Sequence, residues 1–315
     1  MRIDRPVHPP RGEPPVCPGP APAPHAATRF DPPPGSVDCH AHVIGLPPAY
    51  PFVAERSYTP PEATPAAYLR MLDATGMTYG VLVQVSAHGT DNRLMLRTLA
   101  ANPDRLRGVA VIPPKTSERD LAALAEAGVV GLRLNVLFGG GVGFDKLETY
   151  GAIAREMGWH LQFLLDAADL PILAPRLKAL PVPFVVDHMG HMPTSRGRDD
   201  AGFRTLVGLA ADGAWIKLSG AYRISIDGPP YRDVAPFARA LLQAAPERCL
   251  WGSDWPHVAH WAPSLDVGHL LDVFADWAPT PFDRARILVE NPARLYGFPP
   301  VAAAPAPGVA PRAEL

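Results

Sequence analysis

Residues 36–43 read Ser-Val-Asp-Cys-His-Ala-His-Val, and they stand where a proline-rich leader gives way to a regular apolar pattern. Because side chains alternate between the faces of a β-strand, a strand here would place Asp38, His40 and His42 on one face and Cys39 on the other. Two imidazoles in one cleft suit a metal site or general acid–base chemistry. Histidines of a buried strand can also simply satisfy each other's hydrogen bonds, so the pair alone does not decide.

Beyond these residues, a short strand pattern followed by a helix pattern recurs along the chain. Each strand segment is apolar on both faces, which is typical of buried parallel strands joined by helical crossovers. Eight such repeats predict an α/β fold, a (β/α)8 TIM barrel, with a doubly wound open sheet as the alternative. After 36–43, the predicted strands are 79–86, 106–112, 129–136, 159–165, 183–187, 214–219 and 248–253, and the predicted helices are 66–74, 92–101, 118–127, 145–157, 170–180, 201–211, 234–244 and 264–277.

Proline marks both ends of the predicted folded domain. Residues 1–35 are rich in proline and poor in apolar mass, which predicts an extended, disordered leader. Residues 299–315 form a tail rich in alanine and proline, for which we also predict disorder. The folded domain is therefore expected to span residues 36–298.

Composition excludes several classes of function. The chain has 315 residues, of which 47% are hydrophobic and 19% charged, and its net charge of −2 offers no basic surface for nucleic acid. No apolar run is long enough to span a membrane. Three scattered cysteines, Cys17, Cys39 and Cys249, indicate no disulfide framework or structural zinc knuckle and favour a reducing cytoplasm. The charge and the predicted fold are compatible with a monomer and with a homodimer.

Polar residues recur at the ends of the predicted strands. In a TIM barrel the catalytic groups lie at the carboxyl ends of the strands, so this distribution predicts an active site rather than a purely structural role. The residues at these ends are His40, His42, Gln84, Ser86, Arg133, Asn135, Asp187, His188, Arg223 and Asp254.

Four segments resemble the amidohydrolase superfamily, in its second family of TIM-barrel hydrolases. The resemblance spans residues 36–298 and is greatest to 2-pyrone-4,6-dicarboxylate lactonases, because the first loop reads Pro51-Phe-Val-Ala-Glu-Arg-Ser-Tyr-Thr-Pro60. It implies an amidohydrolase-like barrel that hydrolyses a small lactone, as in aromatic catabolism. The segments are Val37-Asp-Cys-His-Ala-His42, Val186-Asp-His-Met-Gly190, Trp251-Gly-Ser-Asp-Trp-Pro-His257 and Asn291-Pro-Ala-Arg-Leu-Tyr-Gly-Phe298.

The resemblance also implies a catalytic role for four residues. Asp254 would act as general base on the attacking water and then return the proton to the leaving oxygen. His40, His42 and His188 would surround the lactone carbonyl and stabilise the oxyanion, directly or through a bound metal.

Substrate binding is expected to involve five further residues. Arg133 and Arg223 would clamp a carboxylate, since guanidinium groups pair with carboxylates in a planar bidentate geometry. Tyr58, Ser86 and His257 would add contacts to the substrate. Four of these residues also have a purely structural interpretation. Arg133 would form a salt bridge at the barrel rim, Arg223 would cover the surface, Tyr58 would pack in its loop and Ser86 would bond to the backbone.

Strand 159–165 bears on the need for a metal. Metal-dependent members of the superfamily usually place a histidine at the end of this strand, where the chain has Gln162 and Leu164, and Arg133 on the preceding strand would repel a cation. We therefore expect no required cofactor, although His40, His42 and Asp254 could bind zinc. The alternatives are a metal-dependent hydrolase or decarboxylase of the same superfamily, and a barrel that only binds ligands.

Two departures from the lactonase pattern concern the substrate. The cations expected after strand 129–136 and after His188-Met-Gly are missing, and the second position holds His191. Each charge-assisted hydrogen bond contributes roughly 1.5–3 kcal/mol, so their loss weakens recognition of a dianion. A lactone with one carboxylate, or with none, also fits the sequence.

Overall fold

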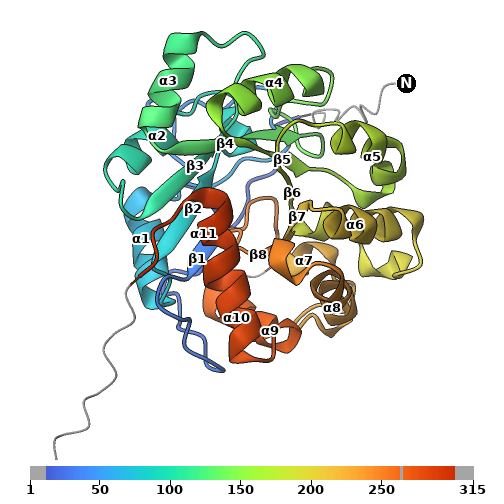
Figure 1. The fold of residues 1–315 in the computed structure, drawn as a ribbon. Coiled ribbons are helices and arrows are strands. Elements are labelled where there is room, and N and C mark those ends of the chain that lie inside the picture. Colours follow the sequence, from blue (N-terminus) through green and yellow to red (C-terminus); the bar gives the residue numbers. More distant parts are fainter. Residues whose placement is uncertain (1–11, 263–264, 302–315) are drawn as a thin grey trace, which may run out of the picture.

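The computed structural model describes residues 12–262 and 265–301, and it confirms the predicted (β/α)8 barrel (Figure 1). All eight strands run parallel, in the order of the sequence. Nearly all of their residues are buried, as expected for strands covered on both faces. The strands are β1 (Val37–Ala41), β2 (Tyr79–Val83), β3 (Leu106–Ala110), β4 (Val129–Asn135), β5 (His160–Leu164), β6 (Phe184–Val186), β7 (Trp215–Leu218) and β8 (Cys249–Trp251).

Helices cover the outside of the barrel, and several begin at the capping residues that their sequences provide. Thr64 and Ser117 each accept a hydrogen bond from a backbone N–H of the first turn, and Asp200 and Asp266 do the same. The helices are α1 (Pro65–Ala74), α2 (Arg93–Ala100), α3 (Glu118–Glu126), α4 (Leu147–Met157), α5 (Leu170–Lys178), α6 (Ala201–Ala211), α7 (Ala221–Ile224), α8 (Ala235–Ala244), α9 (Val267–Trp277), α10 (Pro281–Ala285) and α11 (Asn291–Tyr296).

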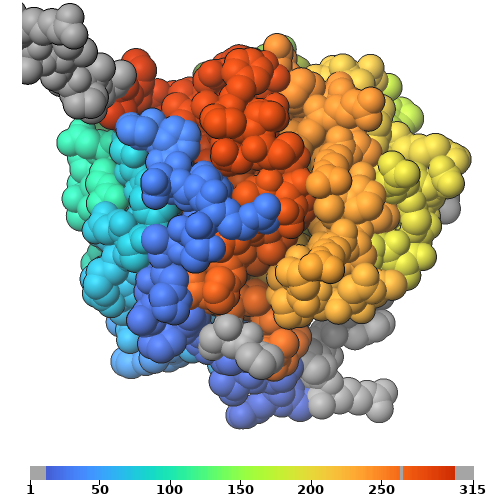
Figure 2. Space-filling model, turned by 90° about the horizontal axis from the view of Figure 1, so that it is seen from below, coloured from blue at the N-terminus to red at the C-terminus, as the bar shows by residue number. Residues whose placement is uncertain are grey.

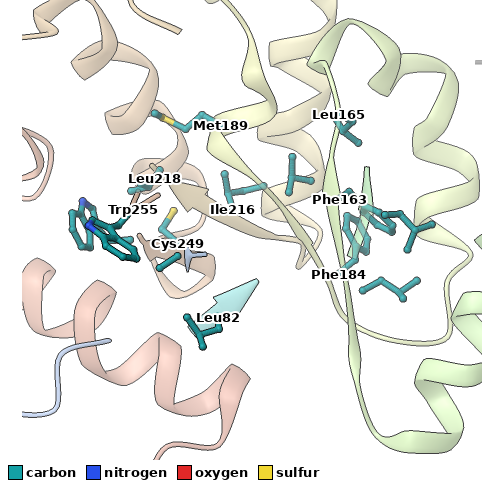
Figure 3. Packing of buried hydrophobic residues seen from close by; sticks show 14 of the residues in the cluster. Leu82, Phe163, Leu165, Phe184, Met189, Ile216, Leu218, Cys249 and Trp255 are labelled. Atoms are coloured by element: carbon teal, nitrogen blue, oxygen red, sulfur yellow. The ribbon is translucent and has the colours of Figure 1, made fainter. Parts of the chain in front are cut away.

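The core has two parts. A large cluster fills the space between strands and helices, and Figure 3 shows Phe163, Ile216 and Leu218 within it. A smaller cluster, which includes Val81, lines the inside of the barrel. It is closed by the residues around α11, which lies across the barrel opening in Figure 1: Phe298 stacks on Tyr79 at the start of β2. The opposite, carboxyl end is therefore the end left for chemistry.

The barrel closes beside the histidine pair. The backbone N–H of His42 donates to the carbonyl of Trp255 at 2.8 Å, and that of Asp254 donates to the carbonyl of His40 at 2.8 Å. These two bonds join β1 to the segment after β8. They bring Asp254 against the histidines although more than two hundred residues separate them in sequence.

The predicted alternation of β1 is wrong at Asp38 and Cys39. Cys39 lies in the inner cluster, whereas Asp38 accepts hydrogen bonds from Ser253 at 2.7 Å and from the hydroxyl of Tyr68 on α1 at 3.2 Å. The register of β1 against β2 shifts between Asp38 and Ala41, and such a bulge reverses the face on which later side chains lie. His40 and His42 still meet, as predicted.

The leader differs from the predicted disorder over residues 12–35. The N–H and hydroxyl of Thr28 bond Asp272 on α9, Arg29 pairs with Asp276, and His25 pairs with Asp266. Figure 2 shows this N-terminal segment, in blue, lying across the C-terminal elements in red and orange. Proline removes donors but also lowers the entropy lost on ordering, so side-chain bonds suffice to hold the segment. Residues 1–11, Ser264 of the last predicted helix and residues 302–315 of the predicted tail lie outside the described residues.

None of the helices within residues 12–262 and 265–301 combines the length and the apolar character needed to cross a membrane.

Candidate active site

The four predicted catalytic residues meet at the carboxyl end of the barrel. The ring of His40 lies 5.0 Å from that of His42 and 4.7 Å from that of His188, measured between centroids. Nε2 of His40 and Nε2 of His42 stand 3.8 and 3.7 Å from Oδ1 of Asp254, and Nε2 of His188 stands 3.7 Å from Oδ2. Three imidazoles thus face one carboxylate in a buried space.

Asp254 has one bound oxygen and one free oxygen. Oδ2 accepts from the hydroxyl of Tyr222 at 2.6 Å and from Nε of Arg223 at 2.5 Å, whereas Oδ1 is buried without a hydrogen-bond partner among the described residues. Burial raises the pKa of this carboxyl, but Arg223 and the neighbouring histidines outweigh burial and hold the pKa well below its usual range. Asp254 is therefore ionised at neutral pH, with Oδ1 available to a water.

The backbone around the site is strained. Six residues other than glycine adopt positive φ angles in the segments after β6 and β8, among them Asp254 at 59° and His188 at 49°. Such conformations cost on the order of 1–3 kcal/mol each and persist where the surrounding structure enforces them, commonly at functional sites. Two of the six, His188 and Asp254, contact each other in the buried cluster around His40.

The histidines of the site are neutral at physiological pH. Burial is the largest effect on both pKa values: it lowers the pKa of His42 to about 4 and that of His188 to about 3. Nδ1 of His42 lies 2.7 Å from the carbonyl oxygen of Val83, an acceptor, so this nitrogen carries the proton and Nε2 keeps its lone pair. Nδ1 of His188 lies 2.8 Å from the hydroxyl of Ser219.

The predicted substrate contacts lie around this centre with different neighbours. Arg133 is buried, donates from Nη1 to the carbonyl of Gln84 at 3.3 Å and has no partner at Nε. Arg223 is committed to Asp254, and its Nη2 donates to the carbonyl of Val258 at 3.0 Å. Both ring nitrogens of His257 are buried without partners among the described residues.

Tyr58 and Ser86 form a small polar group on the same rim. The hydroxyl of Ser86 accepts from Nδ2 of Asn135 at 2.7 Å, and Tyr58 is buried. The ring of Tyr58 packs edge-on against Phe138 at 5.6 Å. These contacts hold the Ser86 hydroxyl and the Tyr58 ring in place without a substrate.

Sequence reasoning missed three residues of the site: Lys217, Tyr222 and Gln162. Nζ of Lys217 lies 3.2 Å from Nδ1 of His40, and Gln162 bridges Lys217 and Asp187. A lysine inside the apolar run Trp215-Ile-Lys-Leu218 was the available signal, because a charge in a core strand needs a partner. Tyr222 left no comparable signal, since its role depends on a contact with a distant carboxylate.

Two groups of side chains bring ligand atoms close enough together to hold a metal: His40 with His42 and Asp254, and His40 with Asp187 and His188. Both groups need a lone pair on His40. Nζ of Lys217 lies 3.2 Å from Nδ1 of His40, so a metal bound by either group would stand beside a buried amino group. Arg223 also already neutralises Asp254. Two basic side chains, Lys217 and Arg223, thus already stand against these ligand groups, and the site does not fit a bound metal.

A cavity of about 870 Å³ lies on the outer side of Tyr222, between the segment around Tyr231 and α9. None of the four predicted catalytic residues lines it. Buried polar atoms without hydrogen-bond partners are costly unless a ligand binds them. The unpartnered atoms of Asp254, His40 and His257 therefore locate the chemical centre better than the 870 Å³ cavity does.

Comparison with known proteins agrees with this architecture. Residues 37–298 match the family model described as Amidohydrolase. The chain is 37% identical over 281 residues to a 2-pyrone-4,6-dicarboxylate hydrolase of Comamonas testosteroni, covering 85% of this chain and 92% of that protein. It is 38% identical to a 4-sulfomuconolactone hydrolase of Rhizobium radiobacter, covering 90% and 96%.

A solved structure from Agrobacterium tumefaciens shares the fold, with a TM-score of 0.78 and 32% identity over 88% of this chain and 98% of that one. The family match, the relatives that it resembles over most of their length and the barrel with its strand-end histidines agree with one another. The chain belongs to the amidohydrolase family.

Proposed function

We propose that the protein is a hydrolase that opens a carboxylated lactone related to 2-pyrone-4,6-dicarboxylate. The observation that carries this proposal is the free Oδ1 of Asp254, which faces Nε2 of His40 and Nε2 of His42 in a buried space. A base beside hydrogen-bonding imidazoles is what water attack on an ester carbonyl requires. The relatives named as lactone hydrolases support the same reaction.

In the proposed reaction, Oδ1 of Asp254 takes a proton from water as the water oxygen bonds to the lactone carbonyl carbon. The carbonyl π-electrons move to oxygen, and His40 and His188 stabilise this oxyanion. His42, predicted to share this role, holds its proton on Nδ1 toward Val83 and has no Nε2–H to donate. When the intermediate collapses, the ring C–O bond breaks and Asp254 returns the proton to the leaving oxygen. The product is the open-chain hydroxy acid or its enol, and Asp254 is restored.

Arg133 is the proposed contact for the substrate carboxylate. Its Nε has no partner, whereas Arg223 is engaged with Asp254. Tyr58, Ser86 and His257 on the surrounding rim offer further hydrogen bonds to the substrate. Arg133 keeps an unpartnered Nε although its Nη2 lies 3.6 Å from Asp187, which favours a lactone held by one carboxylate, and His191, whose pKa burial lowers to about 4, adds no positive charge at neutral pH.

The direct test is hydrolysis of 2-pyrone-4,6-dicarboxylate, followed by the loss of its ultraviolet absorbance. The protein is first treated with a chelator, and its metal content is measured. We expect turnover by metal-free protein. Turnover only after zinc is added would instead support the metal-dependent hydrolase, and turnover of only neutral lactones would exclude the dicarboxylate.

Arg133→Met is expected to raise KM for a carboxylated lactone by about tenfold to a hundredfold, because the substrate loses a charge-assisted hydrogen bond of roughly 1.5–3 kcal/mol. For a neutral lactone with the same ring, KM should change less than threefold, which corresponds to about 0.6 kcal/mol of binding free energy. Steady-state kinetics on the two substrates measure the difference. Equal losses on both would mean that Arg133 only supports the fold.

Arg223→Met is expected to move the acid limb of the rate profile to higher pH. The pKa of Asp254 is held down chiefly by Arg223 against the effect of burial, so removing the guanidinium raises the pKa and protonates the base at a higher pH. The profile of kcat/KM against pH measures this shift. Arg223→Lys, which keeps the charge, is the matched control and should retain a limb nearer to that of the wild type.

A further inference from the structure

Lys217 lies at the centre of the barrel, where a charge is costly to bury unless it is paired. It comes from β7, and its side chain has no exposed surface. Nζ donates to Oε1 of Gln162 at 2.8 Å and lies 3.2 Å from Nδ1 of His40. An ammonium group only donates hydrogen bonds, so Nδ1 of His40 must accept.

Asp187 is the other neighbour of that nitrogen. Its Oδ1 lies 3.3 Å from Nδ1 of His40 and 3.4 Å from Nζ of Lys217, yet it forms no aligned hydrogen bond. Its Oδ2 accepts from Nε2 of Gln162 at 3.0 Å and lies 3.6 Å from Arg133. The carboxylate is thus placed to balance buried positive charge, and the contact aligned on Nδ1 is the one from Lys217.

We propose that Lys217 is a positioning residue that fixes His40 in the tautomer with its proton on Nε2. Nε2 faces the free Oδ1 of Asp254 at 3.8 Å and has no other partner among the described residues. In this tautomer Nε2–H donates to the lactone carbonyl, and the bond strengthens as the oxyanion forms. The positive charge of Lys217 also stabilises the oxyanion, because it polarises the His40 ring that lies between them.

This arrangement gives the two histidines of β1 different roles. His42 carries its proton on Nδ1, toward Val83, whereas His40 carries its proton on the nitrogen that faces the substrate. Lys217 thereby supplies from within the barrel the positive charge that a metal would otherwise bring to the carbonyl. This role of Lys217 rests on the proposed lactone hydrolysis, whereas the tautomer can be measured without any substrate.

Nuclear magnetic resonance of protein labelled with ¹⁵N-histidine tests the tautomer. Correlations between the ring carbon-bound protons and both ring nitrogens tell which nitrogen is protonated, and His40→Gln assigns the signal. We expect wild-type His40 to be protonated on Nε2 and Lys217→Met to move the proton to Nδ1, toward Asp187. His42 should stay protonated on Nδ1 in both proteins and serves as the internal reference.

Two functional measurements separate positioning from a merely structural role. Lys217→Met should lower kcat by about 10²–10³-fold, the effect of losing one oxyanion donor, with little change in KM. Without Lys217, the proton moves to Nδ1 and Nε2 of His40 gains a lone pair. The chelator-treated variant, titrated with zinc chloride, should therefore bind zinc at least about tenfold more tightly than the wild type does. Lys178→Met, which removes a lysine from an exposed pair with Asp212, is the control and should change neither value.

Wild-type His40 protonated on Nδ1, or an unchanged tautomer in Lys217→Met, would overturn the proposal. If that variant does not fold, the double variant Lys217→Met with Asp187→Asn removes both buried charges together and should likewise lose the fixed Nε2–H tautomer. If wild-type His40 has the expected tautomer but the protein hydrolyses no lactone, the positioning role of Lys217 stands and only the proposed function is rejected.

Discussion

Asp254→Asn is expected to lower kcat by about 10³-fold or more, while KM changes little. The amide can still accept from Tyr222 and Arg223 through one oxygen, so the side chain keeps its place. The atom at the Oδ1 position then becomes an amide nitrogen, which cannot take a proton from water. The loss therefore falls on the chemical step rather than on substrate binding. Steady-state kinetics with the substrate established by the absorbance assay provide the measurement.

Asp212→Asn provides the matched control, because it makes the same change on an exposed carboxylate that pairs with Lys178. We expect wild-type kcat from this variant. Thermal unfolding of both variants checks that the barrel is intact. Near wild-type turnover by folded Asp254→Asn would show that another group accepts the proton.

The barrel could be predicted because its signal is repeated and local. Each strand is a short apolar run, each crossover has helical spacing, and the eight repeats reinforce one another. The same regularity placed ten polar residues at strand ends, and the family resemblance selected His40, His42, His188 and Asp254 among them. In the structure, the backbone bonds between β1 and the segment after β8 then bring the first and last of these residues into contact.

What could not be predicted depends on contacts between distant residues or on irregular backbone. The bulge in β1 reverses Asp38 and Cys39, and alternation alone cannot locate a bulge. The role of Lys217 depends on its contacts with His40 on β1, Gln162 on β5 and Asp187 just after β6. Composition suggested disorder for the leader, because bonds such as that of Thr28 to Asp272 depend on the surface of a helix far along the chain.

The stability of the fold is expected to fall steeply as the pH is lowered from 7 to 5. Burial is the main cause of a lowered pKa in eight of the described histidines, five of which have a folded pKa of about 3 or 4, and an unfolded histidine has a pKa near 6.5. Below that pH the unfolded chain binds protons that the folded protein excludes, so stability decreases with falling pH, by up to about 1.4 kcal/mol per pH unit for each group. The folded pKa is about 4 for His42, His191 and His257 and about 3 for His160 and His188.

Carboxyl groups modify this trend without reversing it. Burial raises the pKa of Asp38 to about 6, so its protonation favours the folded protein as the pH falls below 6 and offsets roughly one histidine. The lowered pKa values of Asp187 and Asp254 act only below about pH 4, where unfolded carboxyls begin to bind protons. For these five histidines less Asp38, the net loss between pH 7 and 5 should be on the order of 8 kcal/mol, comparable with the whole stability of many domains.

Urea unfolding at pH 8, 7, 6 and 5, followed by circular dichroism, measures this loss. His257→Phe is the informative variant, because it keeps a ring against Tyr222 and removes one buried imidazole whose two nitrogens lack partners among the described residues. Its stability should fall less steeply with pH, by about 1.4 kcal/mol per pH unit at most. An unfolding midpoint that stays constant from pH 7 to 5 would mean that water or a ligand reaches these imidazoles in the folded protein and lets them ionise there.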